Sequence, residues 1–127
     1  MHDKHLYEYS VIRVVPRVER EEFLNVGIIV FCKKQRFLQT RISVDEQKLL
    51  FLAPESDLLQ VNQNLLSFEK ICSGEKMGGP IALMDVAERF RWLTAVRSSV
   101  IQTSRPHPGI TSDLESTVER LFSDLVL

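Results

Sequence analysis

A segment near the carboxyl end of the sequence concentrates side chains that can bind an anion. Residues 86–110 include four arginines and a single acidic residue, Glu88. Hydroxyl, amide and imidazole groups lie among them, and such a set can form several charge-assisted hydrogen bonds to a phosphate or a carboxylate. The residues that we single out are Arg91, Trp92, Arg97, Gln102, Ser104, Arg105 and His107. Together they predict a surface that binds an anionic or a protein partner.

The same segment also has a purely structural interpretation. Asp85 precedes Arg89 by four residues in a predicted helix, so the two side chains can pair. Glu88 precedes Arg91 by three residues and can pair in the same way. The sequence RPHPG is typical of a loop that keeps the chain extended before the next helix. A binding surface and an ordinary helix end with its loop therefore remain alternatives.

A second group of polar residues lies on predicted strands in the first third of the chain. Arg13 stands among apolar residues of one strand, and Arg41 has a similar position on another. A charge on a covered sheet face needs a partner, and Glu8, Glu22 or Asn25 could supply one. Alternatively, one face of the sheet forms an open polar groove. Its lining is then Tyr9, Arg13, Asn25 and Arg41.

No catalytic or cofactor motif accompanies these residues. The sequence lacks a G-x-S-x-G nucleophile motif, and Gly78 and Gly79 lack the lysine and helix context of a phosphate-binding loop. Cys32 and Cys72 have no second cysteine or histidine at zinc-binding spacing. His107 would need a nucleophile and an orienting carboxylate within reach to act as a general base. The sequence therefore favours a non-catalytic protein that holds no metal ion and no cofactor.

Length and composition indicate one ordinary globular domain. A chain of 127 residues with 44% hydrophobic content can remove roughly two-thirds of its unfolded surface from water. The 16 basic and 17 acidic residues argue against nucleic-acid binding by bulk charge. The first ten residues lack a signal-peptide core, and the longest apolar run, residues 26–32, is far shorter than the about 20 residues that span a bilayer. We expect a soluble, cytoplasmic protein.

The elements that must position these residues begin with three strands, over residues 7–15, 23–32 and 37–44. They are expected to form an antiparallel meander. Residues 23–32 are apolar on both alternating faces, as is typical of a central strand that is covered on each side. Gly27 within this strand indicates a bulge or a close approach of another backbone.

The rest of the chain predicts three helices, a strand and a last helix. Asp45 is the expected cap of the first helix, Gly74 ends the second, and the third covers residues 81–96. A strand at 98–103 precedes a helix at 113–126, which begins with a capping box formed by Ser112 and Glu115. The predicted fold is α+β, with an antiparallel sheet of about four strands in the order β-β-β-α-α-α-β-α and helices packed on one face.

Several segments resemble one protein family. They are YEYSVIRVVP, EFLNVGIIVFC, RFLQTRIS, FRWLTAVRSSVIQTSRPHPG and ESTVERLF. They are similar to the bacterial family called domain of unknown function 3037 (DUF3037), over nearly the whole chain. That family has no established activity, so the resemblance assigns no catalytic residues to this chain. Arg105 and Pro106 stand where the family has less basic residues, so the local charge is expected to be particular to this protein. Family members are often encoded beside a HipA-like kinase, which implies that kinase as a partner in a toxin-antitoxin-like or regulatory module.

Two functions follow. The first is a non-catalytic binding or adaptor module that docks on a protein partner, such as a HipA-like kinase, through the surface between Arg91 and His107. The alternative is a small enzyme or binder that acts on a phosphorylated ligand or a nucleic acid through an anion clamp. That clamp comprises Arg13, Arg41, Arg97, Gln102 and His107. A concave pocket favours a small ligand, whereas a flat patch with an exposed Trp92 favours a protein partner.

Overall fold

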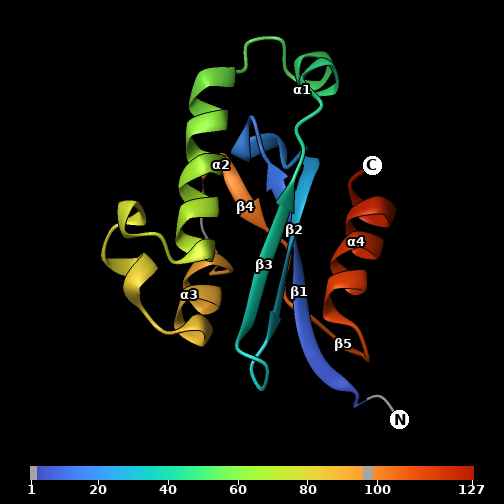
Figure 1. The fold of residues 1–127 in the computed structure, drawn as a ribbon. Coiled ribbons are helices and arrows are strands. Elements are labelled where there is room, and N and C mark those ends of the chain that lie inside the picture. Colours follow the sequence, from blue (N-terminus) through green and yellow to red (C-terminus); the bar gives the residue numbers. More distant parts are fainter. Residues whose placement is uncertain (1–2, 96–98) are drawn as a thin grey trace.

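The computed structural model describes residues 3–95 and 99–127 (Figure 1). Its centre is an antiparallel sheet with the strand order β3-β2-β1-β4, in which β5 also pairs with β1. The strands are β1 (His5–Val14), β2 (Leu24–Cys32), β3 (Phe37–Ile42), β4 (Ile101–Thr103) and β5 (His107–Thr111). The α-helices are α1 (Glu46–Leu52), α2 (Leu58–Ser73), α3 (Val86–Leu93) and α4 (Leu114–Leu125). The predicted α+β class is confirmed, with one strand more than expected.

The pairing of β1 with β2 contains the irregularity that the sequence indicates at Gly27. The register shifts between Ile12 and Arg13, which is a β-bulge. A Cβ atom on Gly27 would lie 2.6 Å from the carbonyl oxygen of Arg41 on the neighbouring β3. Glycine is therefore required here so that β3 can approach β2 beside the bulge.

Helices cover both faces of the sheet (Figure 1). On one face α1, α2 and α3 pack around a core that includes Ile29 and Phe31 of β2. On the other face α4 packs against Ile28 and Val30 of the same strand. The predicted packing on one face thus holds for the first three helices only. The reason lies in β2, because a strand that is apolar on both faces needs a cover on each.

β4 and β5 share one edge of β1. β4 pairs with residues 12–14 and β5 with residues 5–9, both antiparallel. Ser104 joins them, because its N–H donates to the carbonyl oxygen of Val11 and its Oγ accepts from the Val11 N–H, each at 2.8 Å. The predicted loop at residues 105–109 is instead largely strand. Its prolines are tolerated because an edge strand pairs on one side only.

Two of the expected helix caps are confirmed, and a third is formed by a different residue. The Asp45 side chain caps α1, and Gly74 ends α2 with a left-handed φ of 77°, as predicted. α4 is capped by Asp113, whose side chain accepts from the Ser116 N–H, in place of the expected Ser112. Asp113 directly precedes the first helical residue, which is the position that a capping side chain must occupy.

The predicted third helix is divided in two, and its expected ion pairs are wrong. A 3-10 turn, η3 (Pro80–Leu83), is followed by extended backbone at Met84 before α3 begins. Asp85 pairs with Arg36 in the turn between β2 and β3, at 3.1 Å, and not with Arg89. Arg89 instead donates to the carbonyl oxygens of Ile71 and Cys72 at the end of α2, at 3.4 and 3.2 Å. Both carbonyl groups lie in the last turn of α2, and that of Ile71 also accepts from the Gly74 N–H. Arg89 therefore fastens α3 to the end of α2.

Candidate functional site

Arg91 is tied to the sheet and not to its neighbour on the helix. Both of its Nη atoms lie 3.3 Å from the carboxylate oxygens of Glu8 on β1, which replaces the predicted pair with Glu88. Its guanidinium also lies 5.6 Å from the ring centroid of Phe90 and 6.0 Å from that of Phe31. Because the pair is exposed to water, it contributes little to stability. It links α3 to β1 across 83 residues of sequence.

The other residues of the predicted carboxyl-terminal surface do not converge on one ligand position. Ser104 is buried in the strand pairing described above. Arg105 and His107 are exposed at the sheet edge, and the His107 ring lies 5.3 Å from the Tyr9 ring. Arg97 lies outside the described residues. The predicted surface is thus spread along α3 and the β4–β5 edge.

Trp92 and Gln102 do share a groove, which lies between α2, α3 and β4 and has a volume of about 310 Å³. Its lining residues are Asn64, Ser67, Phe68, Ile71, Trp92, Leu93, Ala95, Ser99, Ile101, Gln102 and Thr103. Within the described chain, this lining carries no charged side chain. We call this site the Trp92 groove. Its size lies at the lower limit of ordinary small-molecule sites.

The secondary structure gives the Trp92 groove an apolar floor and a polar rim. Phe68 and Ile71 of α2 and Leu93 of α3 are anchored in the main core, so the floor is fixed by packing. Asn64 and Ser67 of α2 are exposed at the rim. Trp92 itself is 39% exposed. Such a site can take up an apolar side chain while amide and hydroxyl groups hydrogen-bond to the peptide that carries it.

Two members of the second predicted cluster hold α4 on the sheet. Arg41 pairs with Glu119 of α4, and its guanidinium lies 5.2 Å from the ring centroid of Phe122. The Asn25 side chain donates to the carbonyl oxygen of Leu125 at 3.2 Å, at the end of the same helix. These contacts occupy Arg41 and the amide group of Asn25. In the sequence, both residues are candidates for the lining of an open polar groove.

Arg13 and Tyr9 lie on the same sheet face as this pair. The guanidinium of Arg13 stacks 4.1 Å from the ring centroid of Phe23, and the strand register places Arg13 between Asn25 on β2 and Gln102 on β4. Arg13 Nε and Asn25 Oδ1 are buried and lack a hydrogen-bond partner in the part of the chain that the structure describes. Tyr9 is four residues away, about 13 Å along an extended strand, and contacts His107. The structure therefore brings Arg13, Asn25 and Gln102 together and leaves His107 apart.

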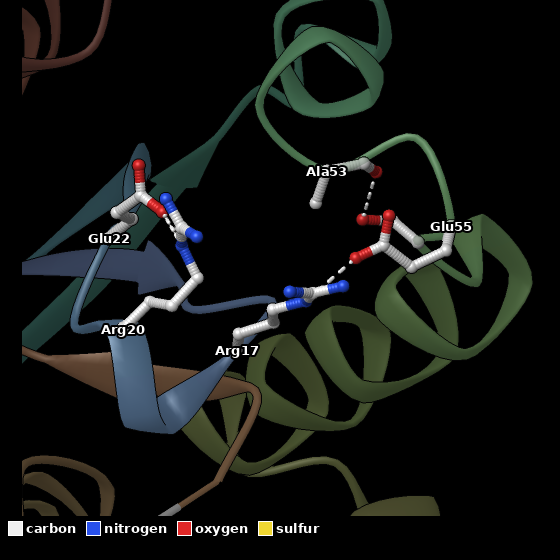
Figure 2. A network of polar contacts seen from close by, with 6 residues as sticks. Arg17, Arg20, Glu22, Ala53 and Glu55 are labelled. Carbon is white, nitrogen blue, oxygen red and sulfur yellow. Dashed lines mark hydrogen bonds and ion pairs between the residues drawn. The ribbon is translucent and has the colours of Figure 1, made fainter.

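A cleft that the sequence does not predict lies beside the connection between α1 and α2 and has a volume of about 230 Å³ (Figure 2). Arg17 Nε pairs with Glu55 Oε1 at 3.0 Å, and Arg20 pairs with Glu22. The hydrogen bond to Glu22 raises the pKa of Arg20. A hydrogen bond from its own backbone N–H, with the nearby Arg17, lowers the pKa of Glu55. Each of these two arginines already has a carboxylate partner, so the cleft has no excess positive charge to attract an anion. In the sequence, only the charged run of residues 17–22 marks this cleft.

The chemistry of the buried thiols is that of core residues. Burial raises the pKa of the Cys72 thiol to about 12, so this thiol is protonated and a poor nucleophile at neutral pH. Cys32 is also buried and free. Among residues 3–95 and 99–127, no three His, Cys, Asp or Glu side chains are grouped so that they could hold a metal ion. Over the same ranges, no helix is both long and apolar enough to cross a membrane.

Comparison with known proteins bears on the family but not on the activity. Residues 9–126 match the model of the family described as "Protein of unknown function (DUF3037)". The chain belongs to the DUF3037 family. No curated protein and no solved structure matches it. The match to the DUF3037 model includes the Trp92 groove, both predicted clusters and the cleft beside Arg17 and Glu55, so all of these features lie within the family domain.

Proposed function

We propose that the protein is a non-catalytic binding module that holds an apolar side chain of a protein partner in the Trp92 groove. The observation that carries the proposal is the composition of this groove, which combines a fixed apolar floor, an exposed Trp92 and an uncharged polar rim in its described lining. Tryptophan is enriched among the residues that dominate binding energy at protein interfaces. The rim of Asn64 and Ser67 suits the backbone of a peptide segment better than a phosphate or a nucleic acid.

The partner that we propose is a HipA-like kinase. The support for it is the association that the DUF3037 resemblance implies, and the groove adds the kind of contact that such a partner must make. The kinase segment should present one large apolar residue, flanked by free backbone groups. Bulk charge should contribute little, since the described lining of the groove is neutral.

A substitution that blocks the Trp92 groove tests whether the kinase binds there. Ser67→Arg places a long side chain at the rim without removing a core contact, because Ser67 is exposed on α2. We expect it to weaken kinase binding by about thirtyfold or more in isothermal titration calorimetry, which corresponds to about 2 kcal/mol. The melting temperature should stay within about 2 °C of wild type.

The matched control is Gln63→Arg, which adds the same side chain to an exposed position of α2 outside the groove. This control should bind the kinase with unchanged affinity. If the wild-type protein fails to bind the kinase, the proposed partner is wrong. If Ser67→Arg and Gln63→Arg bind equally well, the docking site is not the Trp92 groove.

One observation favours a second function, the binding of a small anion at Arg13. Arg13 Nε has no hydrogen-bond partner in the described chain, and Gln102 lies opposite Arg13 in the strand register. A carboxylate or phosphate could accept from both side chains. Titration with pyrophosphate should then release heat that falls steeply as salt rises, and Arg13→Gln should abolish it. Wild-type protein that gives no heat at low salt would rule this function out.

A further inference from the structure

We propose that the free edge of β3 pairs with the same edge of a second copy of the chain, so that the two sheets become continuous across a two-fold axis. β3 is the outermost strand and pairs only with β2 among the described strands (Figure 1). The free edge of β3 lies on the side of the sheet opposite to β4 and the Trp92 groove. The dimer is therefore independent of the proposed kinase contact.

The two edges of the sheet differ in how they are protected. On the β1 side the edge is divided into β4 and β5, interrupted at Ser104, and contains Pro108. Such devices prevent another strand from pairing with an edge. β3 has no such break, because its six residues pair in unbroken register with β2, and it contains neither proline nor lysine. Its one charged side chain, Arg41, is held on the sheet face by Glu119 of α4. An unprotected edge of this length is a template for strand addition, and we infer that it is occupied when the protein functions.

The backbone of β3 presents alternate residues to the free side. The Ser43 N–H donates to the carbonyl oxygen of Val26 at 2.7 Å, just beyond the last pair of the β2–β3 register. Because hydrogen-bonded pairs alternate in an antiparallel ladder, odd-numbered residues of β3 bond to β2. Leu38, Thr40 and Ile42 therefore direct their N–H and C=O groups outward, where a second strand can reach them.

The side chains of β3 are complementary to those of β3 in a second copy when the two strands are related by a two-fold axis. A two-fold axis perpendicular to the sheet keeps its faces aligned, so residues that pair must lie on the same face. With Thr40 on the axis, Leu38 stands opposite Ile42 of the second copy. Gln39 then stands opposite Arg41 of the second copy. The first pair is apolar and the second can form a hydrogen bond, and both kinds of pair stabilise neighbouring strands.

The surface beside β3 supplies apolar area that a second copy would cover. A hollow of about 490 Å³ runs between β3 and α2. Leu66 of α2 lines it and is 50% exposed next to Ile42. In the proposed register, Leu38 of the second copy lies opposite Ile42, so it approaches Leu66. Glu69 and Lys70 also line the hollow, and this mixture of charges does not repel an identical surface.

Opposite charge substitutions at one exposed residue test the register. Gln39→Lys places a lysine opposite Arg41 of the second copy, twice per dimer, and Gln39→Glu places a glutamate there. By sedimentation equilibrium, we expect Gln39→Lys to raise the dimer dissociation constant about two- to thirtyfold and Gln39→Glu to lower it, because each of the two pairs contributes up to about fivefold. The controls are Gln60→Lys and Gln60→Glu, at an exposed residue near β1 and the opposite edge, and these should have no effect.

Amide hydrogen exchange provides a second measurement. On dimerisation the amides of Leu38, Thr40 and Ile42 should become protected, whereas those of Gln39 and Arg41 are already protected by β2. Gln39→Lys should reverse the added protection at the same protein concentration. A wild-type protein that remains monomeric up to about 1 mM overturns the proposal. So does a dimer in which both Gln39 substitutions act in the same direction or the alternating protection is missing.

Discussion

Ser104 and Arg91 show why residues of chemically active types can have structural tasks. Ser104 supplies a hydroxyl oxygen to the Val11 N–H, 93 residues earlier in the chain, and Arg91 pairs with Glu8, 83 residues earlier. Sequence reasoning finds partners within one helix, and for Arg91 it selected Glu88. It cannot find partners that a sheet brings together from opposite ends of the chain. The sequence shows the types of these residues, but their partners depend on the fold.

The buried Cys72 thiol should make the stability of the protein depend on pH. Burial raises the pKa of its thiol from 9.0 to about 12, so above pH 9 the unfolded chain loses a proton that the folded chain keeps. This contribution to stability is complete below that pH and is lost as the pH rises toward 12. We expect the free energy of unfolding, measured in urea between about pH 8 and 11, to fall with pH less steeply in Cys72→Ala than in wild type.

At about pH 8, before this contribution is lost, Cys72→Ala should be less stable than wild type, because it leaves a cavity in the core. The slope of stability against pH is therefore the informative quantity. Comparison of the two slopes isolates the contribution of the Cys72 thiol, because every other ionisable group is the same in both proteins. Equal slopes in both proteins would show that the Cys72 thiol ionises in the folded state as it does in the unfolded chain.

At the level of elements, the sequence predicts those that local patterns determine. Alternating β-branched and aromatic residues located β1, β2 and β3, and the caps at Asp45 and Gly74 fixed the ends of α1 and α2. β5 was missed because two prolines are typical of a loop, and only its pairing with β1 makes the segment a strand. The break before α3 was missed because the apolar spacing continues through Asp85.

α4 makes a stability prediction. Leu121 is 4% exposed and belongs to the core cluster between α4 and the sheet. Leu121→Ala should lower the free energy of unfolding by roughly 2 to 5 kcal/mol in a denaturant titration. Leu59→Ala is the control, because Leu59 is 69% exposed on α2. It should change stability by less than about 0.5 kcal/mol. A loss below about 1 kcal/mol for Leu121→Ala would mean that α4 is only loosely docked.

For the whole molecule, the arrangement of the helices decided which predicted site residues meet. The sequence indicates both clusters, but it cannot show that α4 crosses one sheet face and occupies Arg41 and Asn25. It also cannot show that α2, α3 and β4 enclose a groove beside Trp92, because Phe68 and Ile101 are far apart in the chain. Trp92 and Gln102, which the sequence assigns to an anion-binding or partner-binding surface, line the groove that carries the proposed function.

The pairing of β1 with both early and late strands affects how the protein can be made. β2 follows β1 directly, but β4 and β5 pair with β1 only after α1, α2 and α3 have been synthesised. At about 5 to 20 residues per second, the roughly 90 intervening residues take the ribosome about 4.5 to 18 s. During this interval the second edge of β1 is open on the nascent chain, and α4 has not yet covered the sheet. The sheet can therefore be completed only after β4, β5 and α4 have left the ribosome, and until then the nascent chain presents the open edges of β1 and β3 to chaperones.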